Sequence, residues 1–369
     1  MSRLERILAV MTIICAMFAI VLPIGTRGET TLMSWVLVVS IGYPVLVLLL
    51  LALFTLKLPP VASGVLALVG GTIVLFELTQ FDRASWGYWS LLATAWFVAW
   101  LFAERLANRQ VNRQARSQLG SVLIPAMFGA AILVVWEAVT RGAQVPPVLL
   151  PPPSSIGRVL SQSVPTLAVD FVQTFKAVLI GYGLGNAVAF IVAIAVDRSP
   201  FLKRGLLPLG NFVSALPVIG IAPIMVTWFG FDWHSKVAVV VMMTFFPMLV
   251  NTVAGLAATG AMERDLMRSY GASYGATLLR LRLPAAMPFI FNGLKINSTL
   301  AMIGAIVAEY FGGPTFGMGF RINTQAGLLQ LDLVWAEIAV AALAGSLFYG
   351  AIAYVERLVT FWHPSYRRS

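Results

Sequence analysis

The chain has 369 residues, of which 59% are hydrophobic and only 11% are charged. Soluble domains are usually about a quarter charged, so this composition excludes an ordinary soluble protein and predicts an integral membrane protein. The formal net charge of +10 does not indicate nucleic-acid binding, because the arginines lie in loops between apolar segments. One cysteine, Cys15, and two distant histidines, His234 and His363, exclude a disulfide framework and leave no spacing typical of a metal site.

Ten apolar runs approach the length of about 20 residues that a membrane-spanning helix needs. We therefore predict an all-α integral membrane protein with about ten transmembrane helices. The first run continues to Pro23 without a clear cleavage site, so we interpret it as a retained helix rather than a signal peptide. The predicted helices are Ile7–Ile24, Leu32–Leu56, Val61–Thr79, Trp86–Ala103, Val122–Thr140, Phe171–Val196, Leu206–Phe229, Lys236–Ala258, Pro288–Phe311 and Trp335–Phe361.

The charges of the connecting loops differ between the two sides of this arrangement. Lysine and arginine are concentrated in the loops of one side, namely the N-terminus, Lys57, 105–116, 198–204, 264–282 and 357–368. Loops rich in these residues face the cytoplasm. Both termini and the segment 262–287 are therefore expected on the cytoplasmic side.

Residues 105–120 join the four N-terminal helices (1–104) to the rest of the chain (121–369). Arg105, Arg109 and Arg113 recur every four residues, so a helix would present them on one face. We interpret this segment as a basic cytoplasmic linker that is either solvated or in contact with anionic lipid headgroups.

A proline-rich segment, Gln144–Ser155, follows the fifth predicted helix and reads QVPPVLLPPPSS. Its prolines predict a stiff, extended backbone. Ser154 and Ser155 can cap a short helix, Ile156–Val164, at the outer surface.

The predicted helix Leu206–Phe229 contains three prolines, which a membrane helix tolerates where a cavity or neighbouring groups satisfy the freed carbonyls. We expect this helix to line a translocation path. Its candidate lining residues are Asn211, Ser214, Pro217 and Thr227. In the preceding helix, the spacing Gly181-x-x-x-Gly185 predicts close helix packing.

The predicted helix Pro288–Phe311 contains further polar groups. Charged side chains inside a membrane are costly and usually face a cavity or a partner. Lys295 and Glu309 are about 21 Å apart along a helix, so they do not pair within it. The candidate path residues here are Asn292, Lys295, Asn297, Ser298 and Glu309. The asparagines equally suit contacts between helices. Glu309 suits a role near the outer gate, and a solvated carboxylate at the membrane boundary is the alternative.

A polar segment, Met262–Met287, lies between two long apolar runs and reads MERDLMRSYGASYGATLLRLRLPAAM. Arg264–Tyr270 is predicted to form a short helix, and Gly271 allows the backbone to turn. Ala272–Leu283 is predicted to form a second helix that ends before Pro284. Such a helix pair can bind in a groove of another protein. An ordinary polar loop is the alternative.

The positions of Gly271, Leu281 and Leu283-Pro284 resemble the coupling loop in permease subunits of binding-protein-dependent ABC importers. The signature of that loop is Glu-Ala-Ala, three residues, Gly, nine residues, Ile, one residue, Leu-Pro. Asp265 takes the acidic position here, and Leu266 and Met267 replace the two alanines. This replacement makes the resemblance weaker in the first short helix than from Gly271 onward.

Three other stretches resemble the nitrate/sulfonate/taurine group of these permeases. They are Leu150–Ser154, Ala308-Glu309 before Phe311-Gly312-Gly313, and Trp362–Tyr366. The resemblance covers Ser121–Arg368 and implies a six-helix type I permease core in a bacterial cytoplasmic (inner) membrane. The four N-terminal helices lie outside it and would be a lipid-facing scaffold or a site for an accessory subunit.

The resemblance also implies partners. Two copies of the chain would form the path as a homodimer, two ABC ATPase subunits would dock under the coupling loops, and a periplasmic or lipid-anchored binding protein would deliver the solute. The coupling residues would be Asp265, Arg268, Gly271, Leu281, Leu283 and Pro284. Because the sequence contains no phosphate-binding loop, ATP and Mg²⁺ are expected on the ATPase, and this chain is expected to bind no cofactor and to be no enzyme.

The solute class follows less directly. Lys295 and the basic charge favour a nitrate-, sulfonate- or taurine-like anion, and a thiamine pyrimidine precursor, riboflavin or an aromatic carboxylate are the alternatives. An ion-driven secondary transporter would show broken helices in two repeated halves, and 1–120 contains no repeat of the polar segment. A membrane-embedded enzyme would need a carboxylate or histidine cluster, and none is present in the sequence. A structural scaffold is the remaining alternative.

Overall fold

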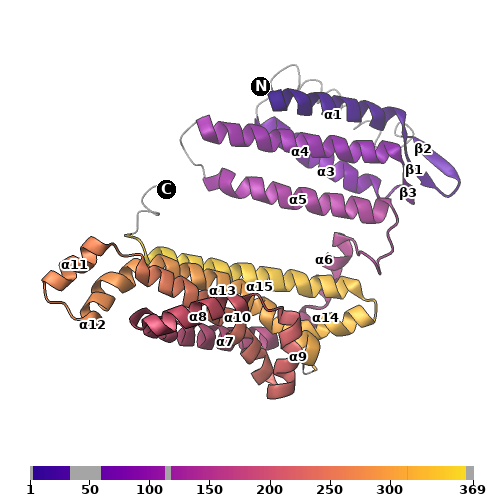
Figure 1. The fold of residues 1–369 in the computed structure, drawn as a ribbon. Coiled ribbons are helices and arrows are strands. Elements are labelled where there is room, and N and C mark those ends of the chain that lie inside the picture. The colour runs from indigo at the N-terminus through magenta and orange to yellow at the C-terminus, as the bar shows by residue number, and fades with distance from the viewer. Residues whose placement is uncertain (1–2, 34–59, 113–117, 314, 363–369) are drawn as a thin grey trace. The chain divides into compact units, whose positions relative to one another are not determined.

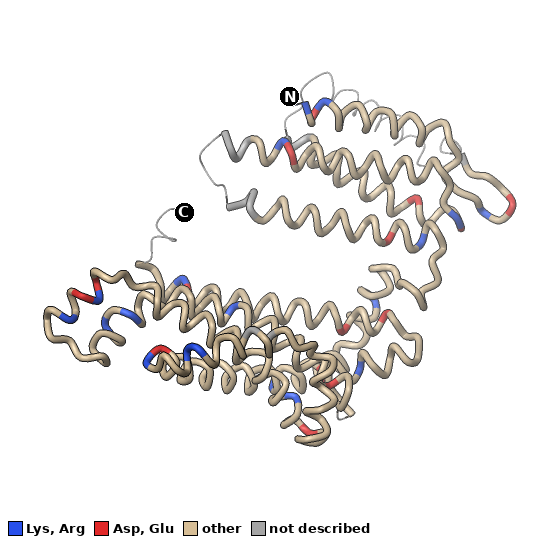
Figure 2. The backbone as a smooth tube through the Cα atoms, in the orientation of Figure 1, with Lys and Arg blue, Asp and Glu red and all other residues tan. Residues whose placement is uncertain are grey.

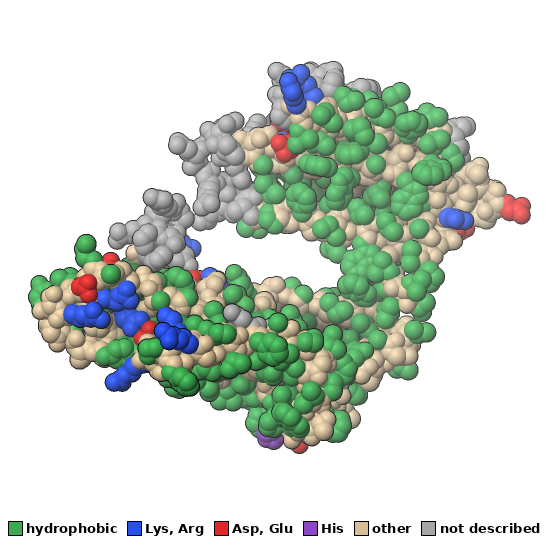
Figure 3. All heavy atoms as spheres, viewed as in Figure 1, with side chains coloured by type: hydrophobic (Ala, Val, Ile, Leu, Met, Phe, Trp, Pro, Cys, Tyr) green, Lys and Arg blue, Asp and Glu red, His purple; other side chains and the backbone are tan. Residues whose placement is uncertain are grey.

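Helices make up most of the computed structural model, which describes residues 3–33, 60–112, 118–313 and 315–362 (Figure 1). The chain divides into two units, Met1–Arg158 (unit 1) and Val159–Ser369 (unit 2). In both units, charged residues gather mainly at helix ends and in loops (Figure 2). Hydrophobic side chains cover much of the visible surface, and Lys and Arg cluster over the 262–287 loop and its neighbourhood (Figure 3). An apolar exterior of this kind suits a lipid environment.

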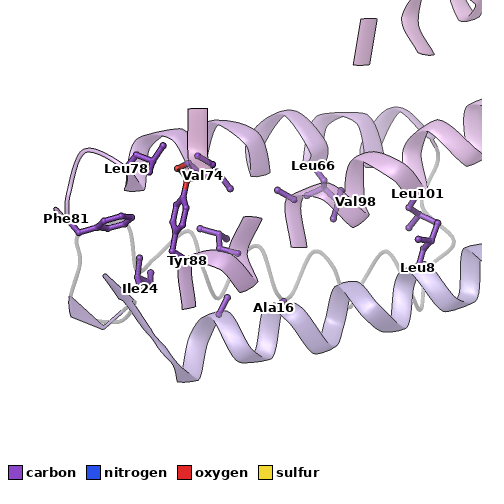
Figure 4. Packing of buried hydrophobic residues seen from close by; sticks show 14 residues of the cluster. Leu8, Ala16, Ile24, Leu66, Val74, Leu78, Phe81, Tyr88, Val98 and Leu101 are labelled. Atoms are coloured by element: carbon purple, nitrogen blue, oxygen red, sulfur yellow. Dashed lines mark hydrogen bonds between the residues drawn. The ribbon is translucent and has the colours of Figure 1, made fainter. Parts of the chain in front are cut away.

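Unit 1 is built around α4 (Trp86–Asn112), which packs against α1 (Arg3–Val21), α3 (Pro60–Glu77) and α5 (Gln118–Gly142). The buried residues of α1 recur at helical spacing, so one face of this helix is covered. They are Glu5, Leu8, Ala9, Thr12, Ala16 and Ala19. In the core of unit 1, Tyr88 reaches toward Val74, whose carbonyl accepts its hydroxyl at 3.3 Å, and Phe81 lies beside its ring (Figure 4).

A small antiparallel sheet in unit 1 was not part of the all-α prediction. It has the strand order β2-β1-β3, with β1 at Pro23–Arg27, β2 at Thr30–Met33 and β3 at Arg83–Ala84. Pro23 cannot continue α1, and Gly28 has φ +59°, which suits the turn between β1 and β2. The predicted helix Leu32–Leu56 therefore begins wrongly within β2, and its remainder lies outside the described residues.

The basic linker is helical where it is described. α4 continues to Asn112, so the predicted end of this helix at Ala103 was too early. Arg105 is only 8% exposed, because it lies on the packed side of α4. The expectation of a solvated or lipid-bound Arg105 is therefore wrong, whereas Arg113 and the Arg109 side chain lie outside the described part of the chain.

The proline-rich segment leads into α6 (Pro153–Gln162). Glu137 of α5 holds its first turn, because its carboxylate accepts the Ser154 backbone N–H at 2.8 Å and the Ser154 hydroxyl at 2.6 Å. The predicted short helix therefore exists, with its bounds shifted toward the N-terminus. Its expected last residue, Val164, is instead the first residue of the next helix.

Unit 2 is organised around α10 (Trp233–Ala257), which packs extensively against α7 (Val164–Arg198) and α13 (Leu283–Gly312). α15 (Leu331–Val359) and the short α14 (Met318–Gly327) pack on α13. α7 begins seven residues before the predicted Phe171, and a proline in its first turn suits a helix start. Gly181 and Gly185 face α10 at the crossing, as the small-residue spacing predicted.

One predicted helix is two helices in the structure. Leu206–Phe229 is divided between α8 (Pro200–Ser214) and α9 (Val218–Phe229). The break lies before Pro217, because the residue that precedes a proline is disfavoured in the α region and proline has no N–H to donate. Pro208 and Pro223, in contrast, lie inside helices.

Seven helices in the described ranges are long and apolar enough to cross a membrane. Two further apolar helices are shorter, namely Ser63–Glu77 of α3 and α9. Over the described ranges the structure thus shows a multi-pass helical membrane protein, and the total of ten spans stays a prediction. The second predicted span lies largely outside the described residues, and the third and seventh correspond to α3 and to the α8–α9 pair.

Candidate functional site

The 262–287 loop forms a helical hairpin-like excursion at one end of unit 2 (Figure 1). It contains α11 (Ala261–Ser269), α12 (Tyr274–Thr277) and η2, a π-helical turn at Leu278–Arg282 that leads into α13. Gly271 has φ +66°, the left-handed conformation that glycine adopts without a Cβ penalty. The predicted turn at Gly271 is therefore confirmed, and the Ser273 hydroxyl accepts the Ala276 N–H at 3.3 Å to begin α12.

α11 presents apolar side chains to its surroundings. Met262, Leu266 and Tyr270 recur every four residues and are 84%, 57% and 80% exposed. Asp265 and Arg268 form an exposed ion pair of 3.4 Å within the same helix. An exposed apolar stripe flanked by charges on a short helix has the features of a protein-docking surface.

The second helix of the loop differs from its prediction at both ends. It begins at Tyr274 rather than Ala272, and it does not end at Pro284, which lies in the first turn of α13. η2 lies directly before Pro284. In a π turn the hydrogen bonds span one residue more than in an α-helix, and the chain thereby passes the proline without leaving the helix. Leu281 is part of η2, and Leu283 begins α13.

Of the candidate path residues here, Asn211, Ser214 and Pro217 lie near the break between α8 and α9, whereas Thr227 lies in the last turn of α9. Asn211 and Ser214 belong to α8, and their side chains lie outside the described residues. Pro217 precedes α9, and the exposed Thr227 donates its hydroxyl to the Pro223 carbonyl at 2.9 Å. A neighbouring cavity of about 90 Å³ has an apolar lining among the side chains that the structure describes. Its lining is Val213, Leu216, Val218, Ile221, Val239, Met242, Met243, Pro247 and Leu300.

Asn297 joins three helices in the interior of unit 2. It is 0% exposed, and its amide donates to Asn186 Oδ1 of α7 at 2.6 Å and to the Thr244 carbonyl of α10 at 2.7 Å. Ser298 is also buried and donates to the Lys295 carbonyl at 2.7 Å. Asn292 is exposed, and its amide donates to Asn251 at 3.1 Å. Of the two expectations for the asparagines, these contacts correspond to links between helices.

Lys295 pairs with a residue that sequence inspection did not single out. Its ammonium lies 2.7 Å from Glu356 Oε2 of α15, and the two side chains are 18% and 7% exposed. The pair satisfies a charge that would otherwise be isolated among apolar helices.

Glu309 is held at the opposite end of unit 2, near α14. It is 2% exposed, and its Oε2 accepts the Thr174 hydroxyl at 2.7 Å and the Gly319 N–H at 3.0 Å. The alternative of a solvated carboxylate is therefore wrong. Asp170 of α7 lies in the same network and accepts the Gly317 N–H and Arg321 Nε, both at 2.7 Å.

A buried lysine completes this end of unit 2. The ammonium of Lys236, which is 2% exposed, donates to the carbonyls of Phe231, Asp232 and Gly312. Gly312 is the last residue of α13, so the cation lies at a helix C-terminus, where it is favoured. Sequence inspection placed Lys236 at the start of a span without a role, because one of its partners, the Gly312 carbonyl, is 76 positions away and no local pattern specifies it.

The predicted site residues therefore lie in separate parts of unit 2. The coupling residues share the 262–287 loop, whereas the path residues divide between α8–α9, the interior of α13 and the Glu309 network. Sequence inspection missed several residues that contact the predicted ones or lie beside them. They include Asp170, Asp197, Glu356 and Arg321. Their signal in the sequence was charge within or beside an apolar span.

Comparison with known proteins identifies the family. Residues 185–361 match the family described as binding-protein-dependent transport system inner membrane component. A formylaminopyrimidine transport permease protein of Halalkalibacterium halodurans is 31% identical over 66% of this chain and 96% of the relative. A riboflavin transport system permease protein of Chloroflexus aurantiacus is 30% identical over 63% of this chain and 88% of the relative. The taurine transport system permease protein of Escherichia coli is 28% identical over 63% of this chain and 87% of the relative.

The protein is a multi-pass inner-membrane transport subunit rather than an enzyme, as its apolar helices, its 262–287 loop and these relatives together indicate. The chain belongs to the family of inner-membrane permeases of binding-protein-dependent ABC importers, in the nitrate/sulfonate/taurine group.

Proposed function

We propose that this permease couples solute import to ATP hydrolysis by docking an ATPase on the 262–287 loop. The observation that carries the proposal is an exposed stripe formed by Met262 and Leu266 of α11 and by Tyr270, which caps its C-terminus, directly before the left-handed Gly271. An ATPase groove would bury these side chains, and removing apolar surface from water would favour docking. Asp265, Arg268, Leu281, Leu283 and Pro284 complete the proposed coupling residues.

The proposed orientation places this loop and both termini in the cytoplasm. It rests on the basic loops and on the position of the loop at the same end of unit 2 as the C-terminus of α15 (Figure 1). The α14 end of unit 2 then faces outward, toward a solute-binding protein. ATP and Mg²⁺ would bind the separate ATPase subunits, because the sequence contains no phosphate-binding loop.

Two copies of the chain would form the path as a homodimer, with α8–α9 and α13 contributing lining residues. In such a homodimer, the stronger candidates for lining the path are the exposed residues Pro217, Thr227 and Asn292. The other candidates Asn297, Ser298 and Glu309 are already buried within one chain. Asn211 and Ser214 stay candidates by their place on α8.

For the solute we propose a nitrate-, sulfonate- or taurine-like anion, the class named for several relatives. A second class, a pyrimidine precursor or riboflavin-like heteroaromatic solute, is favoured by two observations: Lys295 pairs with Glu356, and the described lining of the cavity beside α8–α9 is apolar. An aromatic carboxylate combines both properties. A binding screen with the cognate solute-binding protein, followed by competition in uptake, separates the three.

Residues 1–104 are proposed to be an extension of the six-helix core at 121–369, with 105–120 between them. The relatives support this division, because they align with about two thirds of this chain while the alignment covers most of their own length. We propose that the extension is a scaffold in the lipid or a site for an accessory subunit.

The coupling proposal is tested with Gly271→Val in the reconstituted complex. A β-branched residue at φ +66° is strained by roughly 1–2 kcal/mol or more, so the hairpin of α11 and α12 should be misaligned. We expect ATP hydrolysis to lose its stimulation by the loaded binding protein, and uptake to fall. Gly275→Ala is the matched control, because Gly275 lies in α12 with open space around a Cβ. Unchanged stimulation and uptake in Gly271→Val would contradict the proposal.

A further inference from the structure

Arg282 ties three helices together at the end of unit 2 that carries the 262–287 loop. It is the last residue of η2, and its guanidinium forms a two-pronged pair with the Asp197 carboxylate of α7, at 2.6 and 2.7 Å. The same guanidinium donates from Nε and Nη2 to the Leu256 carbonyl of α10, at 3.0 and 2.8 Å. One side chain thus connects α7, α10 and the turn that leads into α13.

Asp197 also binds the other end of this short segment. The Tyr274 hydroxyl, from the first residue of α12, donates to Asp197 Oδ2 at 3.1 Å. The Arg198 guanidinium lies 5.3 Å from the centroid of the Tyr274 ring, within the range of a cation–π contact. The first and last residues of the α12–η2 segment (274–282) are therefore bound to one carboxylate.

Burial and geometry make this a firm connection. The Arg282 and Asp197 side chains are 12% and 8% exposed. Paired N–H···O bonds between guanidinium and carboxylate are stronger and more directional than single neutral bonds. Arg282 also satisfies a carbonyl in the last turn of α10, where a cation is favoured. A lysine could replace the positive charge but not the paired, coplanar N–H donors of the guanidinium.

α11 lacks such a connection. In the described part of the chain, its side-chain hydrogen bonds run from Arg268 and Ser269 to Asp265, within the same helix. The loop therefore consists of an exposed helix on a glycine turn and a second segment fixed to two membrane helices.

We propose that Asp197 and Arg282 are positioning residues that make α12–η2, α13 and the adjoining ends of α7 and α10 move as one body when an ATPase displaces the loop. This inference rests on the coupling role proposed above for residues 262–287. It assigns the transmission of the movement to the Asp197–Arg282 pair, whereas α11 serves as the docking element.

The test compares Asp197→Asn and Arg282→Lys with the unmodified permease, each reconstituted with its ATPase and binding protein. Asp197→Asn keeps the shape of the side chain and removes its charge. Arg282→Lys keeps the charge and removes the paired N–H donors of the guanidinium. Both variants should retain the ATPase subunits and hydrolyse ATP, while solute imported per ATP falls at least about fivefold. Arg141→Gln is the control, because it removes one partner of the Arg141–Glu137 pair in unit 1 and should leave this ratio unchanged.

An unchanged ratio of imported solute to hydrolysed ATP in both variants would overturn the proposed role of the Asp197–Arg282 pair. It would not contradict the proposed coupling role of residues 262–287. Failure of the unmodified chain to bind an ATPase, or full coupling in Gly271→Val, would instead overturn the proposed function. If the variants do not fold, nitroxide labels at Leu279 and Ile191, which are 65% and 66% exposed, test the unmodified pair. The distance between the labels should be the same in the nucleotide-free and ATP-bound complexes, and a change between these states would refute the rigid connection.

Discussion

The Lys295 ammonium lies 2.7 Å from Glu356 Oε2, so α13 and α15 are joined by an ion pair within their apolar spans. Lys295 was the one lysine that sequence inspection offered as a contact for an anionic solute. Its pairing gives it a structural partner of opposite charge. The preference for an anion must then rest on other groups, and the relatives that transport heteroaromatic compounds gain weight.

The ion pair predicts an asymmetry between single and double variants. Lys295→Gln should lower the free energy of unfolding by about 3 kcal/mol, because it leaves the buried Glu356 unpaired. Lys295→Gln combined with Glu356→Gln should recover most of this loss and retain uptake. Thermal unfolding in detergent and uptake by proteoliposomes measure the two effects. Loss of uptake in a stable double variant would show that the Lys295–Glu356 pair serves transport and not stability alone.

The crossing of α7 and α10 predicts different responses from two neighbouring glycines. A Cβ at Gly185 would lie 2.1 Å from Thr244 Oγ1 and 3.1 Å from Val241 Cα, whereas a Cβ at Gly183 meets nothing within 4 Å. Gly185→Ala should therefore cost about 1–3 kcal/mol of stability through overpacking. Gly183→Ala should be neutral or stabilise the helix by up to about 1 kcal/mol. Equal unfolding temperatures for the two variants would contradict the close crossing.

The buried amide of Asn297 predicts a larger effect than its exposed neighbour. Asn297→Ala removes two hydrogen bonds to α7 and α10 and should cost about 1–2 kcal/mol. Asn292→Ala removes one exposed hydrogen bond, to Asn251, and should cost less than about 1 kcal/mol. Denaturant titration of the purified permease compares them. A larger effect of Asn292→Ala on uptake than on stability would support its place on the path.

The Asp170 contacts predict that this carboxylate holds α14 in place. Asp170→Asn removes the charge that Arg321 and the Gly317 N–H share. Hydrogen exchange at Gly317, Met318 and Gly319 should become faster, since the start of α14 loses its anchor. Asn323→Ala, which removes an exposed hydrogen bond from α14 to the Tyr310 carbonyl, is the control and should change exchange less. Unaltered exchange in Asp170→Asn would exclude this anchoring role.

Several features could be predicted from the sequence because their causes are local. Apolar runs identified α4, α5, α7, α10, α13 and α15 as spans, since each must satisfy its backbone groups within lipid. Gly271 was expected at a turn, and its φ of +66° follows from a residue without a Cβ. Element bounds were less accurate: Pro217 divided an expected helix, whereas Pro284 did not end one. The difference lies in η2, whose hydrogen-bond pattern no propensity indicated.

What the sequence by itself determined is the membrane character of the chain, its main spans and the place of the coupling loop, because lipid burial and backbone sterics act over short stretches. The tertiary structure alone decided which charges meet. Arg282 and Asp197 are 85 positions apart, and Arg321 and Asp170 are 151 apart. Such pairs are selected by the energy of an unpaired charge in an apolar interior, and that energy depends on which helices pack together, not on any local pattern.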